Sequence, residues 1–123
     1  MTKKKILIID DETSITKLLK FALERTERYT VEGENNGQKA MTVIRTFLPD
    51  VILLDVNMPE MSGGEISAAL QEDASLKNIP VIFLTGMVSQ EEMESGLTIG
   101  GRPALAKPID LERLVACVEK NLT

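Results

Sequence analysis

Three short runs of apolar residues, at 6–9, 51–54 and 81–84, constrain the fold of this chain more than any other feature. Each run is rich in β-branched residues, contains no polar residue and is followed directly by a polar side chain. A strand with one face in water alternates apolar and polar residues, whereas a strand covered on both faces is apolar throughout. The three runs therefore predict buried strands of a parallel sheet.

Segments with helical periodicity lie between and after these strands, behind residues that commonly cap helices. The expected helices are residues 15–23 after the capping candidates Thr13 and Ser14, 40–48 after Asn36, about 64–70, a segment opening with the capping-box pattern at 89–92, and a last segment opening at Asp110. The helix from residue 89 has few apolar anchors and contains a glycine, so we expect its packing to be weak.

Two weaker strands, at residues 29–31 and 103–106, complete an alternation of strand and helix that is repeated five times. Right-handed crossovers between parallel strands place the helices on both faces of such a sheet. The predicted fold is therefore α/β, with a doubly wound, five-stranded parallel sheet. A length of 123 residues fits one compact unit, so we expect residues 1–123 to form a single domain.

Composition excludes several classes of function. The chain has 14 Lys and Arg against 19 Asp and Glu, a net charge of −5, so direct nucleic-acid binding by a basic face is not expected. It has no histidine, which excludes Ser-His-Asp and Cys-His catalysis and leaves oxygen atoms as the ligands for any metal.

No segment approaches the roughly 20 apolar residues of a spanning helix, so membrane contact is not expected. The single cysteine, Cys117, is expected to be buried and reduced in a cytoplasmic protein.

Polar residues stand at the positions where the predicted strands end. Asp10 and Asp11 follow the first apolar run, Asp55 follows the second, Thr85 follows the third, and Lys107 follows the weak strand at 103–106. In an open parallel sheet the functional crevice lies beyond the carboxyl ends of the strands. We therefore expect three carboxylates, a hydroxyl and an ammonium group at one edge of the sheet.

This set of groups predicts phosphoryl chemistry with a bound cation. Neighbouring carboxylates repel one another unless they share a cation, and Mg²⁺ prefers oxygen ligands and takes few carboxylates. A phosphoryl group would meet the metal, the Lys107 ammonium, the Thr85 hydroxyl and backbone N–H groups. Each residue alone has an ordinary explanation: a helix cap for the Asp10–Asp11 pair, a turn for Asp55 and for Thr85, and a solvated side chain for Lys107. Their joint placement favours the functional interpretation.

At these residues the sequence resembles the receiver domain of two-component response regulators, which has the flavodoxin-like fold of chemotaxis response regulators. The resemblance covers essentially the whole chain. Its motifs are the acidic pair within residues 6–12, the phosphorylation-site signature at 55–59 with Gly63, the switch hydroxyl and its small neighbour at 85–86, and the lysine and cis-proline at 107–108. Together they make the resemblance specific.

The resemblance implies a role for each site residue. Asp55 would accept a phosphoryl group from a histidine kinase or a phosphotransfer protein. Mg²⁺ would be held by Asp11, Asp55 and the backbone carbonyl of Asn57, with Asp10 acting through water. Thr85 and Lys107 would bind the phosphoryl oxygens. Such a domain assists its own phosphorylation and dephosphorylation, signals to a downstream protein target and is not a turnover enzyme.

One residue departs from the family pattern. Receiver domains usually have a tyrosine or phenylalanine three residues before the Lys-Pro pair, where this chain has Ala104. The phosphorylation site is complete, but the aromatic part of the usual output relay is missing. This departure leaves open a receiver-like interaction module that works without phosphorylation.

Two other classes of function compete with the signalling switch. Phosphatases of the haloacid dehalogenase type also use an aspartyl nucleophile and Mg²⁺, but they need an acid two residues after the nucleophile, where this chain has Asn57. A flavin-binding flavodoxin is disfavoured because the first loop is acidic where a phosphate-binding loop offers hydroxyls and N–H groups. Aromatic residues are also only 3% of the chain, too few to suggest a flavin site.

Overall fold

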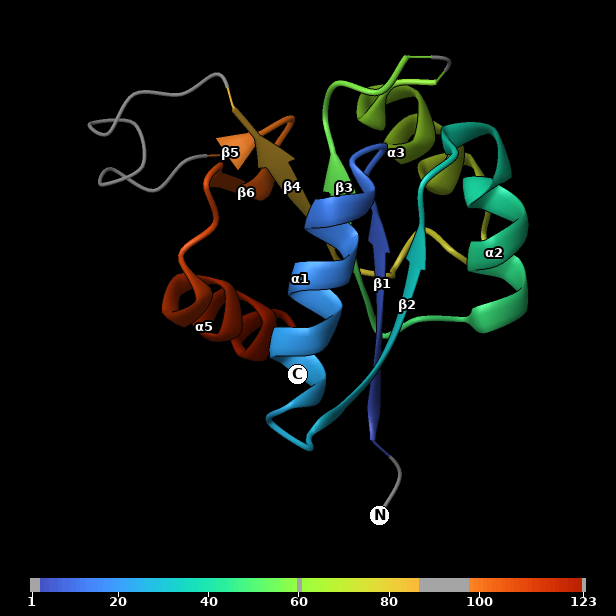
Figure 1. The fold of residues 1–123 in the computed structure, drawn as a ribbon. Helices are drawn as coiled ribbons and strands as arrows, with labels where there is room; N and C mark the ends of the chain where they lie inside the picture. Colours follow the sequence, from blue (N-terminus) through green and yellow to red (C-terminus); the bar gives the residue numbers. More distant parts are fainter. Residues whose placement is uncertain (1–2, 60, 87–97, 123) are drawn as a thin grey trace.

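The computed structural model describes all residues except 1–2, 60, 87–97 and 123 (Figure 1). A six-stranded sheet with the order β2-β1-β3-β4-β6-β5 forms the centre. The strands are β1 (Lys4–Ile9), β2 (Tyr29–Glu34), β3 (Val51–Asp55), β4 (Val81–Thr85), β5 (Thr98–Ile99) and β6 (Arg102–Ala106). All neighbouring pairs are parallel except β5 with β6. The predicted doubly wound α/β fold is confirmed.

Helices cover both faces of the sheet, with α1 and α5 on one face and α2 and α3 on the other (Figure 1). Their bounds are α1 (Thr13–Glu24), α2 (Ala40–Phe47), α3 (Gly63–Glu72) and α5 (Leu111–Asn121), and a short 3₁₀ helix, η1 (Gly37–Lys39), leads into α2. The expected helix from residue 89 lies outside the described residues. Among the helices that the structure describes, none has the length and apolarity needed to cross a bilayer.

The apolar runs are uninterrupted because alternate residues of each strand serve different cores. On β1, Leu7 and Ile9 belong to the core under α2 and α3, whereas Ile6 and Ile8 belong to the core under α1 and α5. All four side chains are fully buried. Burying such a side chain contributes about 1.5–3 kcal/mol. The two cores therefore fix the central strands from both sides and hold their carboxyl ends in register.

The short strand β5 was not expected from the sequence, so the prediction of a purely parallel, five-stranded sheet is wrong in this detail. Thr98 and Ile99 pair antiparallel with Pro103 and Arg102 of β6. Gly100 and Gly101, which join the two strands, both have positive φ angles, of 56° and 80°. Glycine adopts such angles without a steric penalty, and a two-residue hairpin turn requires them.

Helix starts differ from the predicted caps in two places. The residue before α1 is Glu12, and its side chain makes no capping hydrogen bond, so neither Thr13 nor Ser14 is the cap. Asn36 does act as a cap, but its side chain accepts a hydrogen bond from Gln38 N at the start of η1 rather than of α2. The predicted start of the last helix is confirmed, because Asp110 accepts hydrogen bonds from the first turn of α5.

Cys117, on α5, is only partly buried, which corrects the expectation of full burial. It packs at the margin of the core under α1 and α5 rather than within it. Burial is nevertheless sufficient to raise the pKa of its thiol, so the unreactive thiol form is favoured.

Gly63, the first residue of α3, packs directly against the end of β3. A Cβ atom there would overlap the carbonyl oxygen of Asp55, and the Gly63 N–H donates to the carbonyl oxygen of Val56 at 3.0 Å. At Gly64 a Cβ atom would meet nothing closer than the Ser62 hydroxyl at 3.8 Å. The close approach at Gly63 therefore sets where the strand carrying Asp55 ends.

We expect the two neighbouring glycines to respond oppositely to alanine. Gly63→Ala should lower the free energy of unfolding by about 1–3 kcal/mol, because the backbone of β3 must move. Gly64→Ala should raise it by about 0.4–1 kcal/mol, because alanine loses less backbone entropy within a helix. Urea denaturation measures both changes. Equal effects of the two substitutions would show that the contact with β3 is not tight.

Candidate functional site

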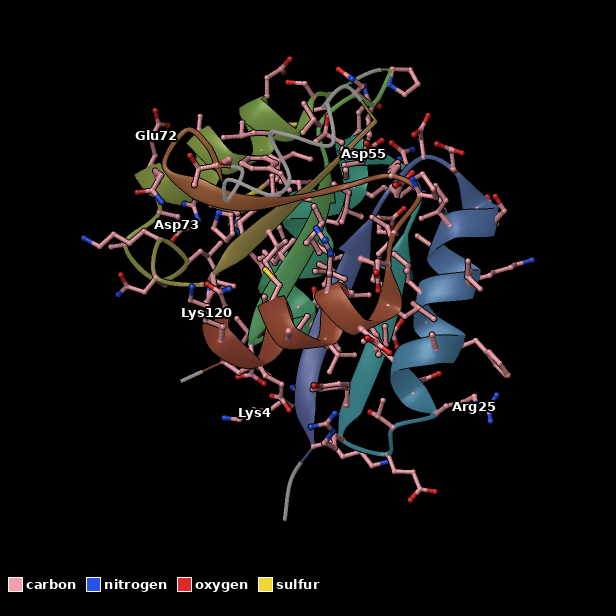
Figure 2. All side chains as sticks on the ribbon, turned by 90° about the vertical axis from the view of Figure 1, so that its left-hand side faces the viewer. Lys4, Arg25, Asp55, Glu72, Asp73 and Lys120 are labelled. Carbon is pink, nitrogen blue, oxygen red and sulfur yellow. The ribbon has the colours of Figure 1, made fainter. Side chains whose placement is uncertain are left out.

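The predicted site residues meet at the carboxyl edge of the sheet. Asp10 follows β1, Asp55 ends β3, Thr85 ends β4 and Lys107 follows β6, and these four strands are neighbours in the sheet. Figure 2 shows Asp55 at the end of the sheet opposite to Lys4, where β1 begins. Asp10, Asp55 and Thr85 are buried, with exposed fractions of 0%, 4% and 4%. Asp11 lies beside them and is exposed.

The Lys107 ammonium lies among three carboxylates. Its Nζ atom is 2.8 Å from Asp10 Oδ2, 3.3 Å from Asp55 Oδ1 and 3.3 Å from Glu12 Oε1. The side chain is 16% exposed, so these interactions are only partly screened by water. Glu12 was not predicted as part of the site. The sequence signal for it is its place next to the Asp10–Asp11 pair, in the same loop.

The pKa values of Asp55 and Lys107 are both shifted by their surroundings. The pKa of Asp55 is raised to about 6: burial contributes most to the increase, the charge of Asp10 adds to it, and Lys107 offsets part of it. Burial alone would lower the pKa of Lys107, but the Asp10 and Asp55 carboxylates raise it above its usual value. Lys107 therefore remains a cation, while Asp55 is a carboxylate whose charge the metal-free fold tolerates poorly.

The three aspartates are close enough to share a cation. One carboxylate oxygen from each of Asp10, Asp11 and Asp55 lies within 4.8 Å of the others. Asp10 Oδ2 is buried and faces the Lys107 ammonium at 2.8 Å, and a carboxylate oxygen has a second lone pair. Such an oxygen can accept from a metal-bound water. This set of hard oxygen donors fits Mg²⁺, and it contains no nitrogen or sulfur ligand for a transition metal.

The loop after β1 is held in place by Asn35, the residue after β2. Its Nδ2 atom donates to the Asp10 carbonyl oxygen at 2.7 Å and to Thr16 Oγ1 at 2.8 Å. The side chain of Asp10 is fixed from its own loop, because Oδ1 accepts from the Glu12 N–H at 2.9 Å. Sequence reasoning missed Asn35, which could have been found among the polar residues that follow the weak strand predicted at 29–31.

Backbone contacts place Lys107 beside the end of β4. The Lys107 N–H donates to the Thr85 carbonyl oxygen at 2.8 Å, and the Lys107–Pro108 peptide bond is cis, as the resemblance implied. On the neighbouring strands, Phe83 of β4 is the register partner of Ala104 of β6, and both belong to the core under α2 and α3. The aromatic ring in this layer is therefore supplied by β4.

Residues 6–119 match the family model described as the response regulator receiver domain. The chain belongs to this family. The match spans all the motifs named above, so the resemblance inferred from the sequence is confirmed, and the phosphatase and flavodoxin alternatives are disfavoured. The receiver domain is the phosphoacceptor unit of two-component response regulators; such domains bind Mg²⁺ and interact with histidine kinases and downstream effectors.

Curated relatives are longer than this receiver domain. The phosphate regulon transcriptional regulatory protein PhoB of Pseudomonas aeruginosa is 38% identical over 116 residues, which are 94% of this chain and 50% of that protein. The response regulator PleD of Caulobacter vibrioides is 36% identical over 119 residues, 97% of this chain and 26% of that protein. The chain thus spans about half the length, or less, of these relatives.

Solved structures with the same fold match almost end to end. The chemotaxis protein CheY4 of Vibrio cholerae has 31% identity and a TM-score of 0.83, over 98% of this chain and 100% of that one. The receiver domain of a signal transduction histidine kinase from Syntrophus aciditrophicus has 33% identity and a TM-score of 0.82, over 97% of this chain and 89% of that one. The flavodoxin-like fold is therefore shared with chemotaxis regulators.

Replacing Asp55 by asparagine should stabilise the metal-free receiver domain at neutral pH. The pKa of Asp55 is about 6 in the folded state, above its usual value of 3.8, so folding favours the protonated carboxyl group. The contribution of this group to the free energy of unfolding is fully present below about pH 4 and is lost as the pH rises through 6. Asp55→Asn avoids this loss, so it should gain on the order of 2 kcal/mol at about pH 7.5 and little at about pH 4. Thermal melts with a chelator present test this.

Asp73→Asn provides a control with the opposite sign. Hydrogen bonds from Ser75 lower the pKa of Asp73, so its ionised form favours the folded state and its replacement should reduce stability at neutral pH. A stability gain for Asp55→Asn that did not change with pH would contradict the electrostatic explanation.

Proposed function

We propose that Asp55 is the phosphoacceptor of this receiver domain and that phosphorylation there switches a signalling surface. The observation that carries the proposal is the position of its buried carboxylate, close to the acidic pair and 3.3 Å from the Lys107 ammonium. Asp10 is equally buried, but its two oxygens are engaged by the Glu12 N–H and by the charge of Lys107. Asp55 is held less closely, with Oδ1 at 3.3 Å from Lys107 Nζ against 2.8 Å for Asp10 Oδ2, which favours it as the nucleophile.

The other site residues bind and orient the transferred group. Lys107 would pair with one phosphoryl oxygen and Thr85 would donate its hydroxyl to another, because both lie at strand ends next to Asp55. Asp11, Asp55 and the backbone carbonyl of Asn57 would hold Mg²⁺, with Asp10 acting through a bound water. The metal supplies charge neutralisation for the phosphoryl oxygens.

The proposed switch works in a larger signalling system. Residues 1–123 would form one receiver domain that takes its phosphoryl group from a histidine kinase or a phosphotransfer protein in the cytoplasm. It would pass the signal to a protein target without turning over a substrate. The relatives support a role in regulation, since PhoB is a transcriptional regulatory protein and PleD a response regulator.

Incubation with acetyl phosphate and Mg²⁺ should add one phosphoryl group to the protein. The Asp55→Asn variant should gain none, because an amide is not a nucleophile toward phosphorus. Intact-protein mass spectrometry measures the added mass. If the asparagine variant gains the same mass as the parent, the phosphoacceptor is another residue and the proposal is wrong.

Mg²⁺ affinity should depend more on Asp11 than on Asp10. A direct carboxylate ligand contributes more than one that acts through water, so Asp11→Asn should weaken binding by roughly tenfold and Asp10→Asn by less. Isothermal titration calorimetry with magnesium chloride gives both affinities. Equal losses, or no loss in either variant, would contradict this assignment of ligands.

A further inference from the structure

Among the described acidic partners of Lys107, the Glu12 carboxylate is the one that the proposed phosphoryl site does not use. Its Oε1 atom lies 3.3 Å from Lys107 Nζ, the same distance as that from Lys107 to Asp55. The Glu12 side chain is 56% exposed, whereas those of Asp10 and Asp55 are buried. Glu12 therefore approaches the ammonium from the side open to water, where a phosphodonor must also arrive.

The backbone of Glu12 is fixed although its side chain is exposed. The Glu12 N–H donates to Asp10 Oδ1 at 2.9 Å, and the Glu12 carbonyl oxygen accepts from the N–H groups of Ile15 and Thr16 in the first turn of α1. These bonds tie the residue to the acidic pair on one side and to the helix on the other. Its side chain thus starts from a defined point beside Lys107.

Helix capping does not explain a glutamate at this position. Glu12 precedes α1, where serine, threonine, aspartate or asparagine would cap the free N–H groups, and its side chain makes no capping bond. The longer side chain instead reaches across 95 positions of sequence to Lys107. The described contacts of the carboxylate are consequently with the site, not with the helix.

We propose that Glu12 competes with the incoming phosphoryl group for the Lys107 ammonium and so limits how readily Asp55 is phosphorylated. This inference rests on the proposed function of Asp55 and Lys107. Before phosphorylation, Glu12 satisfies part of the charge of Lys107. To bind a phosphoryl oxygen, Lys107 must release Glu12, and the displaced carboxylate then repels the arriving dianion. Glu12 is a positioning residue, because it acts through Lys107.

The transfer step itself is unchanged by this competition. With acetyl phosphate as the donor, a bond forms between an Asp55 carboxylate oxygen and phosphorus, while the bond between phosphorus and the acetyl oxygen breaks. Acetate leaves with the electron pair and needs no proton. Asp55, with one negative charge, and the dianionic donor give the dianionic aspartyl phosphate and one acetate anion, so charge balances.

Removal of the Glu12 charge should accelerate phosphorylation by a small, defined factor. An exposed ion pair contributes up to about 1 kcal/mol, which corresponds to roughly two- to fivefold in a rate or an affinity. Glu12→Gln should therefore be phosphorylated by acetyl phosphate roughly two- to fivefold faster than the parent at low salt. Its affinity for beryllofluoride, an anionic mimic of the phosphoryl group, should rise by a similar factor.

Two further variants separate the local effect from changes in net charge or folding. Glu24→Gln, at the far end of α1, changes the net charge equally and should leave both quantities unchanged. Glu12→Asp keeps the charge but shortens the side chain. Its phosphorylation rate and its beryllofluoride affinity should therefore lie between those of the parent and those of Glu12→Gln. The gain in Glu12→Gln should also shrink in about 0.5 M salt, where exposed charges are screened. If Glu12 only stabilised α1, its substitution would change the melting temperature but not the phosphorylation rate, the beryllofluoride affinity or their dependence on salt.

The outcomes distinguish this inference from the proposed function. If the parent protein is phosphorylated on Asp55 and Glu12→Gln behaves like Glu24→Gln, or is slower than the parent, the competition is overturned and the phosphoacceptor assignment stands. If acetyl phosphate labels Asp55→Asn as fully as the parent, the proposed function fails first. A faster Glu12→Gln variant with higher beryllofluoride affinity, and an intermediate Glu12→Asp, support the competition.

Discussion

The pairing of Lys107 with buried carboxylates is the interaction on which this site depends. Asp10 and Asp55 are almost fully buried, and two such anions side by side are costly unless a cation lies between them. The ammonium group of Lys107 supplies that cation at 2.8 Å and 3.3 Å. It compensates the charge only in part, since the pKa of Asp55 remains raised. The residual negative charge favours the binding of a metal ion, and the same lysine remains available to an incoming anion.

The parallel sheet is what makes this pairing possible. Asp10 and Lys107 are far apart in the chain but extend two strands of one sheet, with β3 and β4 between them. The two apolar cores fix the strands from both faces, and the close packing of Gly63 against Asp55 fixes where β3 ends. Rigid elements hold the buried acids, while Asp11, Asn57 and Glu12 lie on the exposed loops where ligands arrive. The strand ends thus hold Asp55 and Thr85 in fixed positions, while the loops present the exposed groups of the site.

Most of the fold and site could be predicted from the sequence because each signal was local. The uninterrupted apolar runs indicated buried parallel strands, and the residue after each run indicated the site. The hairpin of β5 was missed because it depends on positive φ angles at Gly100 and Gly101 rather than on strand propensity. Glu12 and Asn35 were missed because their roles depend on contacts with residues distant in sequence, at Lys107 and Asp10. Periodicity and propensity carry no information about such contacts.

The aromatic side chain beside Ala104 belongs to β4 and not to β6, which bears on how a change at the site can spread through the sheet. Receiver domains usually carry an aromatic residue at the position of Ala104, but here its register partner Phe83 supplies the ring. Phe83 lies two residues before Thr85 on the same strand, so the two side chains share a face. Phe83 also lines a groove of about 580 Å³, with Arg102 and residues of α3 among its other described walls. A displacement of Thr85 toward a phosphoryl group would therefore reach this groove along β4 itself, without crossing to a β6 side chain. One methyl group at Ala104 is too small to transmit it.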